Sequence, residues 1–293
     1  MSDGTQPEIY LSVIIPAFNA EATLGDQLEA LVLQQPPFSW EVIVADNGST
    51  DRTLTVAARY AGDHSHVRAL DASSRRGPAF ARNAAAKAAS GEVLAFCDAD
   101  DIVGEGWVAA MGSALRQHPF VTGPIERTLL NQDWLCAAYG SSGGSEPDTF
   151  AGTFPFSTSA NVGLQRQCFE DLAGFDESLQ VGEDIELSMR LWQRGIDLHF
   201  EPEALVHYRL RHNLKDLWRQ SYKYGKAAVT VYGRLRGVTT PGHHWSRGAK
   251  NWVWLVRHLP LLRTNSGRAR WIVVAGGAAG RLVGSISSRT CYL

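Results

Sequence analysis

The first hundred residues alternate between short apolar runs and longer segments in which apolar residues recur at helical spacing. Runs rich in Val, Ile and Leu predict four buried strands, at residues 10–16, 41–46, 67–70 and 92–98. The intervening segments predict three helices, at residues 20–35, 51–61 and 77–90. Because strands that alternate with helices are joined by right-handed crossovers, we expect a parallel sheet between two layers of helices.

The remainder of the chain is less regular. Its spacing predicts helices at 105–117, 183–195 and 213–237, with a break at 237–245, and extended segments at 118–130, 157–165 and 197–210. A Gly- and Ser-rich stretch, 139–154, predicts a mobile loop, which in an enzyme would be a candidate lid. We therefore divide the chain into an α/β domain, residues 1–212, and a helical C-terminal region, residues 213–293.

Charge divides the chain near the same place. Residues 1–216 hold all 30 acidic residues and 15 of the 28 Lys and Arg, whereas residues 217–293 hold the other 13 and no acid. The basic part also contains five of the nine tryptophans. This pattern predicts an anionic partner, either a membrane surface or the acidic domain itself. Nucleic acid is disfavoured because no binding module accompanies the charge, and the apolar run 271–284 is shorter than the roughly 20 residues of a spanning helix.

Two further features of the sequence indicate where in the cell the protein is located. The N-terminal "MSDGTQPEIY" lacks the basic and apolar parts of a signal peptide, and the four cysteines have no metal-binding or disulfide-framework spacing. We therefore expect a cytoplasmic protein, peripheral at the inner face of the plasma membrane if the basic region binds lipid.

A polar cluster follows each of the four early strands. These clusters are "PAFN" (16–19), "DNGSTD" (46–51), "DASSRRG" (71–77) and "CDADD" (97–101). In open parallel sheets ligands bind beyond the carboxyl ends of the strands, so the four clusters predict one composite site. Glycine fingerprints for dinucleotides and the P-loop are absent, which disfavours a dehydrogenase or a P-loop enzyme. Asp98 and Asp100 suit a hard divalent cation such as Mg²⁺ or Mn²⁺. The alternative is a turn in which Asp98 or Asp101 caps the helix near residue 105.

Six segments carry a resemblance to a known family. "VIIPAFNAEATL", "VIVADNGSTDRT", "GPAFARNAA" and "LAFCDADD" are similar, in order and spacing, to the inverting glycosyltransferases of family 2. "ANVGLQRQCFEDLAGFDE" and "GEDIELSMRLWQRG" are similar to the acceptor-side segments of that family. The resemblance extends from about Tyr10 to about Tyr224. It implies a GT-A fold, which is a Rossmann-like mixed sheet flanked by helices, here with a helical C-terminal appendage.

The resemblance also implies roles for individual residues. The donor-binding set is Pro16, Ala17, Asn19, Asp46, Arg82, Asp98, Asp100 and Asn161. Within this set, Asp46 would accept a hydrogen bond from the base, and Asp100 would be the principal ligand of Mn²⁺ or Mg²⁺. Asp98 and His207 would complete the metal site, and Asp184 would be the catalytic base.

Each assignment has a structural alternative. Asp184 and its neighbour Glu183 could favour a helix start through the backbone dipole, and Asp46 could be a turn residue. Arg82 could be a helix-surface charge, His207 a structural histidine and Asn161 a buried turn residue. Asp101 is left as a cap or a supporting group, and Asp51 is expected to cap a helix.

The function implied is transfer of a sugar, with inversion and metal assistance, from a nucleotide-diphospho-sugar to an acceptor hydroxyl. A UDP-sugar is the preferred donor and GDP-mannose the next, and the acceptor is a lipid-linked or envelope glycan. Two alternatives stay open: a nucleotidyltransferase that makes sugar nucleotides, and a non-catalytic protein that binds them. A nucleotidyltransferase would usually carry a Gly-rich loop with a basic residue after the first strand, where this chain has "PAFNAEATLG".

Overall fold

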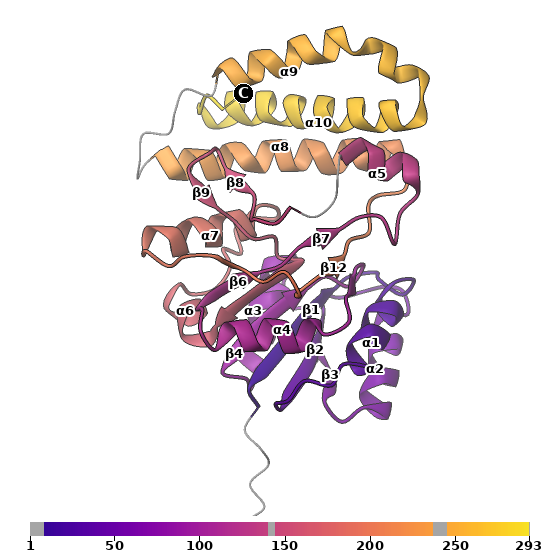
Figure 1. Cartoon of the computed structure of the whole chain (residues 1–293), viewed down its shortest axis with the longest axis vertical. Helices are drawn as coiled ribbons and strands as arrows, with labels where there is room; N and C mark the ends of the chain where they lie inside the picture. The colour runs from indigo at the N-terminus through magenta and orange to yellow at the C-terminus, as the bar shows by residue number, and fades with distance from the viewer. Residues whose placement is uncertain (1–8, 140–143, 237–244, 293) are drawn as a thin grey trace, which may run out of the picture. The chain divides into compact units, whose positions relative to one another are not determined.

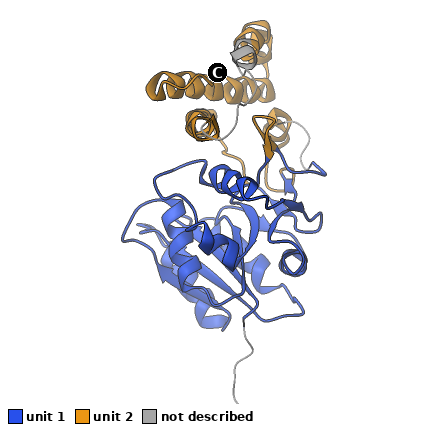
Figure 2. Ribbon diagram, turned by 90° about the vertical axis from the view of Figure 1, so that its left-hand side faces the viewer, with its two compact units in different colours: residues 1–126, 144–148, 155–208 blue, residues 127–143, 149–154, 209–293 orange. Residues whose placement is uncertain are grey.

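Two compact units make up the chain, and a computed structural model describes residues 9–139, 144–236 and 245–292 of it. Unit 1 comprises residues 1–126, 144–148 and 155–208 (Figure 2). Unit 2 comprises residues 127–143, 149–154 and 209–293. The sequence predicts a single boundary between residues 212 and 213. Unit 2 instead includes two earlier segments of the chain, and α5, within the first of them, packs with the C-terminal helix α10.

A seven-stranded mixed sheet forms the centre of unit 1 (Figure 1). In spatial order its strands are β11 (His199–Phe200), β6 (Phe120–Thr122), β10 (Asn161–Gln165), β4 (Val93–Cys97), β1 (Leu11–Ala17), β2 (Trp40–Asp46) and β3 (Val67–Asp71). The four strands predicted in the first hundred residues are confirmed, and they pair in parallel. Because β10 runs antiparallel between β4 and β6, the whole sheet is mixed.

Alternate residues of β1 face opposite layers of helices. Val13 and Ile15 pack in the same core as α1, α2 and α4, whereas Ile14 packs with α3, α6 and α7. The helices of unit 1 are α1 (Leu24–Val32), α2 (Thr53–Asp63), α3 (Pro78–Ala88), α4 (Trp107–Leu115), α6 (Arg166–Asp171) and α7 (Glu183–Gln193). Strand side chains alternate between faces, so a β1 that is buried almost throughout requires cover on both sides. This is the expected three-layer α/β arrangement.

Short strands replace the longer extended segments predicted in the second half. The segment 118–130 divides at Gly123 and Pro124 into β6 and β7 (Ile125–Glu126), and 197–210 divides into β11 and β12 (Val206–His207). β12 pairs with β7 and with β5 (Ile102–Val103) in a three-stranded sheet. A side chain at Gly123 would place its Cβ 1.9 Å from the carbonyl oxygen of Ala204, so the close approach of these segments needs glycine.

The predicted mobile loop at 139–154 is wrong in part. Residues 149–150 and 154–155 form two short strands, β8 (Thr149–Phe150) and β9 (Phe154–Pro155). Residues 140–143 of this stretch, and residues 237–244 of the predicted helix break, lie outside the described residues.

Helices dominate unit 2. They are α5 (Asp133–Tyr139), α8 (Leu214–Arg236), α9 (Trp245–Arg257), the short 3₁₀ helix η1 (Leu259–Arg263) and α10 (Asn265–Ser288). α10 packs on α8, on α5 and on α9 (Figure 1). The backbone N–H of Leu210 donates to the Asn131 side chain at 2.7 Å, which joins the segment before α5 to the segment before α8.

Small residues set the close approach of α8 and α10. A Cβ at Gly280 would lie 2.1 Å from the carbonyl oxygen of Tyr222, and a Cβ at Gly225 would lie 2.2 Å from that of Gly277. Backbones can approach this closely only where side chains are missing. The glycines of the run 271–284 are therefore explained by helix packing. Among the described helices, none combines the length and the hydrophobicity needed to span a membrane.

Candidate functional site

The carboxyl ends of β1 and β2 form the first part of the candidate site. The strand register places Pro16 beside Ala45 and Ala17 beside Asp46. Asn19 has a φ of 50°, a left-handed conformation that Asn tolerates better than most residues. In this conformation its side-chain oxygen accepts the backbone N–H of Thr50 at 2.8 Å. The predicted donor-binding residues of the first two clusters therefore lie together, with the carboxylate of Asp46 buried and accepting the N–H of Ser49.

Asn47 ties the third cluster to the second. Its side-chain amide donates to the carbonyl oxygens of Ala72 at 2.6 Å and Arg75 at 2.7 Å, and its oxygen accepts the N–H of Gly77 at 2.8 Å. The guanidinium of Arg76 donates to the carbonyl oxygen of Asn47 and lies 4.5 Å from the centre of the Phe18 ring. Asn47, Arg76 and the exposed Phe18 are site residues that the sequence analysis missed. All three stand in the polar clusters that follow the strands, which were the available signal: Phe18 in "PAFN", Asn47 in "DNGSTD" and Arg76 in "DASSRRG".

The fourth cluster supplies a group of three carboxylates. Asp98, Asp100 and Asp101 each offer an oxygen atom, and these atoms lie within 4.8 Å of one another. Three carboxylate oxygens at this spacing fit Mg²⁺ or Mn²⁺, which prefer oxygen ligands. The buried side chain of Gln27 holds the turn, because it donates to the carbonyl oxygen of Asp98 at 3.0 Å and accepts the N–H of Val103 at 2.9 Å.

Arg82 on α3 joins this metal motif to the start of α7. Its guanidinium lies 2.6 Å from the carboxylate of Asp98 and 2.9 Å from that of Glu183, and its side chain is 4% exposed. Burial would lower the pKa of Arg82, but the charges of Asp98 and Glu183 raise it above the ordinary arginine value. The alternative of a helix-surface charge is therefore wrong for Arg82.

Asp184 lies at the start of α7, beside Glu183. The backbone N–H of Ser159 donates to one carboxylate oxygen at 3.1 Å, and that of Ile185 donates to the other at 2.8 Å. Burial and the charge of Glu183 raise the pKa of Asp184 to about 6 from an ordinary value of 3.8, although these two N–H groups act in the opposite direction. A carboxylate with this pKa can accept a proton near neutral pH.

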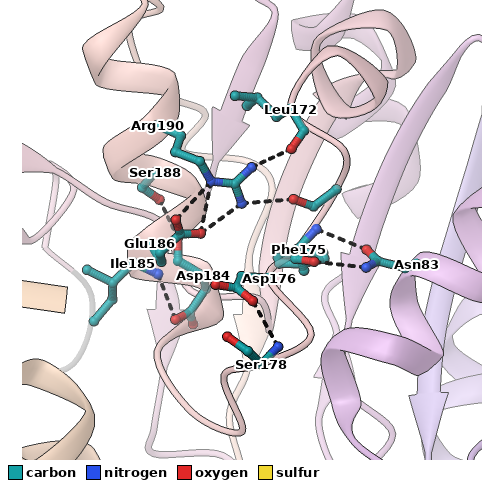
Figure 3. Close-up of polar contacts among 11 residues, drawn as sticks. Asn83, Leu172, Phe175, Asp176, Ser178, Asp184, Ile185, Glu186, Ser188 and Arg190 are labelled. Carbon is teal, nitrogen blue, oxygen red and sulfur yellow. Dashed lines mark hydrogen bonds and ion pairs between the residues drawn. The ribbon is translucent and has the colours of Figure 1, made fainter. Parts of the chain in front are cut away.

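The loop that leads into α7 is fixed from two sides (Figure 3). The side chain of Asn83 on α3 exchanges hydrogen bonds with the backbone of Phe175, at 2.9 Å each. Arg190 on α7 pairs with Glu186 and donates to the carbonyl oxygens of Leu172 at 2.6 Å and Gly174 at 2.8 Å. These contacts hold the segment "AGFDE" against both helices and so set the position of Asp184.

The last two predicted residues have structural partners. Asn161 is fully buried; its oxygen accepts the indole N–H of Trp107 at 2.9 Å, and its amide donates to the carbonyl oxygens of Pro124 and Ala204. This favours the buried structural role that was kept as its alternative. His207 pairs through Nδ1 with Glu126 at 2.8 Å, and the register of β12 places it beside Ile102, the residue after Asp101. Its role as a metal ligand stays a prediction.

The mixed sheet fits the GT-A class predicted from the sequence, and so do its two acidic pairs, Asp98 with Asp100 and Glu183 with Asp184. A family model described as glycosyl transferase family 2 matches residues 12–164, and one described as glycosyl transferase family group 2 matches residues 95–280. The chain belongs to glycosyl transferase family 2. It is therefore an enzyme, and the family predicted from the six sequence segments is confirmed.

Several curated glycosyltransferases are similar in sequence to this chain, two over most of its length and one over about a third of it. Glycosyltransferase AglE of Haloferax volcanii is 26% identical over 226 residues, which are 76% of this chain and 74% of that protein. Pre-mycofactocin glycosyltransferase of Mycobacterium tuberculosis is 27% identical over 273 residues, 90% of this chain and 55% of that protein. The chain thus spans about half the length of this second relative. An Escherichia coli protein, UDP-Glc:alpha-D-GlcNAc-diphosphoundecaprenol beta-1,3-glucosyltransferase WfgD, is 37% identical over 102 residues, 35% of this chain and 38% of that protein.

Solved structures agree with the fold. Mannosyltransferase PcManGT from Pyrobaculum calidifontis, in complex with GDP-Man and Mn²⁺, matches 97% of this chain and 76% of its own with a TM-score of 0.59 and 17% identity. S. aureus TarS 1-349 in complex with UDP-GlcNAc matches 97% of this chain and 93% of its own with a TM-score of 0.58 and 16% identity. The GT-A architecture predicted from the resemblance is confirmed.

Proposed function

We propose that this chain transfers a sugar from a nucleotide-diphospho-sugar to an acceptor hydroxyl with inversion, with Asp184 as the base. The observation that carries the proposal is the Arg82 bridge. Through one buried guanidinium it joins Asp98, in the metal motif, to Glu183, which is adjacent to Asp184 in sequence. The acidic cluster proposed to hold the metal and the helix start that carries the proposed base are therefore joined through one buried cation.

The donor would lie along the carboxyl edge of β1, β2 and β4. Pro16, Ala17 and Asn19 would line the base and ribose, and Asp46 would accept a hydrogen bond from the base. Asp100 would be the principal ligand of Mn²⁺ or Mg²⁺, with Asp98 and His207 beside it. When bound, such an ion supplies positive charge to the leaving diphosphate. We place Arg82 as a positioning residue, since both of its ion pairs are with protein carboxylates.

The reaction would proceed in one displacement. The acceptor oxygen forms a bond to the anomeric carbon, the bond from that carbon to the diphosphate oxygen breaks, and the electron pair leaves with the nucleoside diphosphate. Asp184 takes the proton from the acceptor hydroxyl as the new bond forms, a contribution of roughly 10²–10⁴-fold in rate. Attack opposite the leaving group inverts the anomeric centre. No paired acid and nucleophile for water, as in a glycosidase, is needed.

The donor we propose first is a UDP-sugar, and the second is GDP-mannose. The E. coli relative is named for a UDP-Glc donor, and the solved structures with this fold hold UDP-GlcNAc or GDP-Man with Mn²⁺. We propose a lipid-linked or envelope glycan as the acceptor, since the same E. coli relative is named for a diphosphoundecaprenol-linked acceptor. The family assignment disfavours the nucleotidyltransferase and the non-catalytic alternatives.

A nucleotide screen tests the proposal. Thermal shift with UDP and GDP, with and without Mn²⁺, should reveal a metal-dependent stabilisation by one nucleotide. Asp100→Ala should remove the metal dependence, and the matched control Asp63→Ala, an exposed residue at the end of α2, should retain it. Stabilisation by neither nucleotide in the presence of metal would contradict the donor class.

A further inference from the structure

Helix α9 has one face that packs within unit 2. Leu255 is buried against Ala275 and Ala278 of α10, and the indole N–H of Trp271 donates to the carbonyl oxygen of Leu255 at 3.0 Å. In unit 2, α10 contacts both α9 and α8 (Figure 1). The side of α9 that faces away from α10 is therefore left without a helical partner among the described elements of this unit.

That outer side carries a continuous apolar stripe. Its residues are Trp252, Val253, Val256 and, in η1, Leu259, all of them exposed. Residues three and four apart are neighbours on a helix surface, so Val256 adjoins both Trp252 and Val253 on one side of α9. Val256 alone is 70% exposed. A tryptophan and three large aliphatic side chains are thus exposed together, and such a patch marks an interaction surface.

Positive charge borders the stripe. Lys250, Arg257, Arg263 and Arg268 are exposed on α9, η1 and the first turn of α10. From residue 217 to residue 293 the sequence contains no Asp or Glu to neutralise them. An apolar stripe with an interfacial tryptophan and flanking Lys and Arg matches a bilayer surface in which anionic head groups surround an apolar interior.

We infer that this outer face of α9 and η1 docks on a membrane of anionic lipid, with the four apolar side chains entering the interface and the four basic side chains contacting head-group phosphates. The inference deepens the proposed function and rests on it in one respect. Docking on a membrane brings the enzyme to the lipid-linked acceptor proposed above. All of the side chains proposed to contact the membrane belong to unit 2.

Vesicle flotation of the full chain tests the inference. We expect binding to vesicles of equal parts phosphatidylglycerol and phosphatidylcholine at low salt, and release at high salt because surface charges are screened. Val256→Glu should weaken the partition coefficient at least tenfold. The matched control is Leu33→Glu, because Leu33 in unit 1 is also 70% exposed, and it should leave vesicle binding unchanged. The double variant Arg257→Gln/Arg263→Gln should lose about 30-fold in vesicle binding at low salt, at roughly fivefold per charge, whereas Arg52→Gln/Arg59→Gln should not.

Three results would overturn the inference. One is wild-type protein that stays in the soluble fraction with anionic vesicles at low salt. Another is equal binding to vesicles of phosphatidylcholine alone. The third is a dimer that becomes monomeric in Val256→Glu without any vesicle binding, which would assign the face to a second copy of the chain. No sugar transfer is measured in flotation, and the nucleotide thermal shift is measured without lipid, so failure of either proposal is distinguishable from failure of the other.

Discussion

The guanidinium of Arg82 and the carboxylate of Asp98 lie 2.6 Å apart, at the point where α3 meets the carboxyl end of β4. The same guanidinium pairs with Glu183 at 2.9 Å, so two carboxylates share one buried cation. In the region the structure describes, this network joins the metal motif to the helix of the proposed base. Its loss should therefore affect both stability and metal binding.

Arg82→Met should lower the free energy of unfolding by about 3–5 kcal/mol, because it leaves two carboxylates without their buried partner. Urea unfolding measures this change. Arg82→Lys retains the charge, but one ammonium group cannot pair with both carboxylates in the geometry of the guanidinium. We therefore expect an intermediate loss of stability and weaker Mn²⁺ affinity. The control is Arg68→Met, at the more exposed pair with Glu41, where a loss of about 1 kcal/mol or less is expected. Equal losses at the two positions would contradict the special role of Arg82.

Asp184→Asn should abolish sugar transfer while it raises stability at neutral pH. The pKa of Asp184 is raised to about 6, so between about pH 4 and pH 6 the folded protein holds a proton that the unfolded chain has released. The free energy of unfolding therefore falls as pH rises through this window, and the penalty is constant above it. The shift corresponds to about 3 kcal/mol at most, and partial exposure of Asp184 reduces this to about 1–2 kcal/mol. Urea unfolding at several pH values should show the gain at pH 7 and its disappearance below about pH 4.

The rate of transfer should depend on the same group. With saturating metal, kcat/KM should fall about tenfold per pH unit below about pH 6, as the base becomes protonated. Glu183→Gln should move this limb to lower pH, because the charge of Glu183 is one of the two main causes of the raised pKa. Glu170→Gln, at an exposed acid on α6, is the control and should leave the limb in place. A limb that stays unmoved in Glu183→Gln would assign it to another group.

Much of unit 1 is predictable because its signals are local. The apolar runs of β1, β2, β3 and β4 and the polar clusters after them stand in the sequence itself, and the register of parallel strands then brings Ala17 beside Asp46. The burial of Arg82 is not predictable in this way, since Glu183 lies 101 residues away along the chain. Which segments of the chain make up unit 2 cannot be predicted from the sequence for the same reason. Residues 127–139 join the C-terminal helices only through packing between distant segments, as the hydrogen bond between Asn131 and Leu210 illustrates.

Gln27 holds the turn that follows Asp98, 71 residues further along the chain, so its role is not visible in the sequence around it. Gln27→Leu removes the hydrogen bond to the part-buried carbonyl oxygen of Asp98 and the bond from the buried N–H of Val103. We expect a loss of about 1–3 kcal/mol in the free energy of unfolding, together with Mn²⁺ binding weakened several-fold because the turn at 98–103 loosens. Isothermal titration with Mn²⁺ and UDP measures the second effect. Gln34→Leu removes comparable hydrogen bonds to Gly104 and Val108, outside the motif, and should reduce stability without weakening Mn²⁺ binding.

Helix packing in unit 2 can be tested at one glycine. Gly280→Ala introduces a Cβ 2.1 Å from the backbone oxygen of Tyr222, so α8 and α10 must separate to accept it. We expect the free energy of unfolding to fall by about 1–3 kcal/mol, the usual cost of overpacking. Gly62→Ala is the matched control, because Gly62 lies on α2 with no atom within 4 Å of an added Cβ, and it should gain about 0.4–1 kcal/mol by restricting the unfolded chain. Opposite signs for the same substitution would establish that the glycines of α10 serve close helix packing, whereas a gain in both variants would show that α8 and α10 are not packed at this distance.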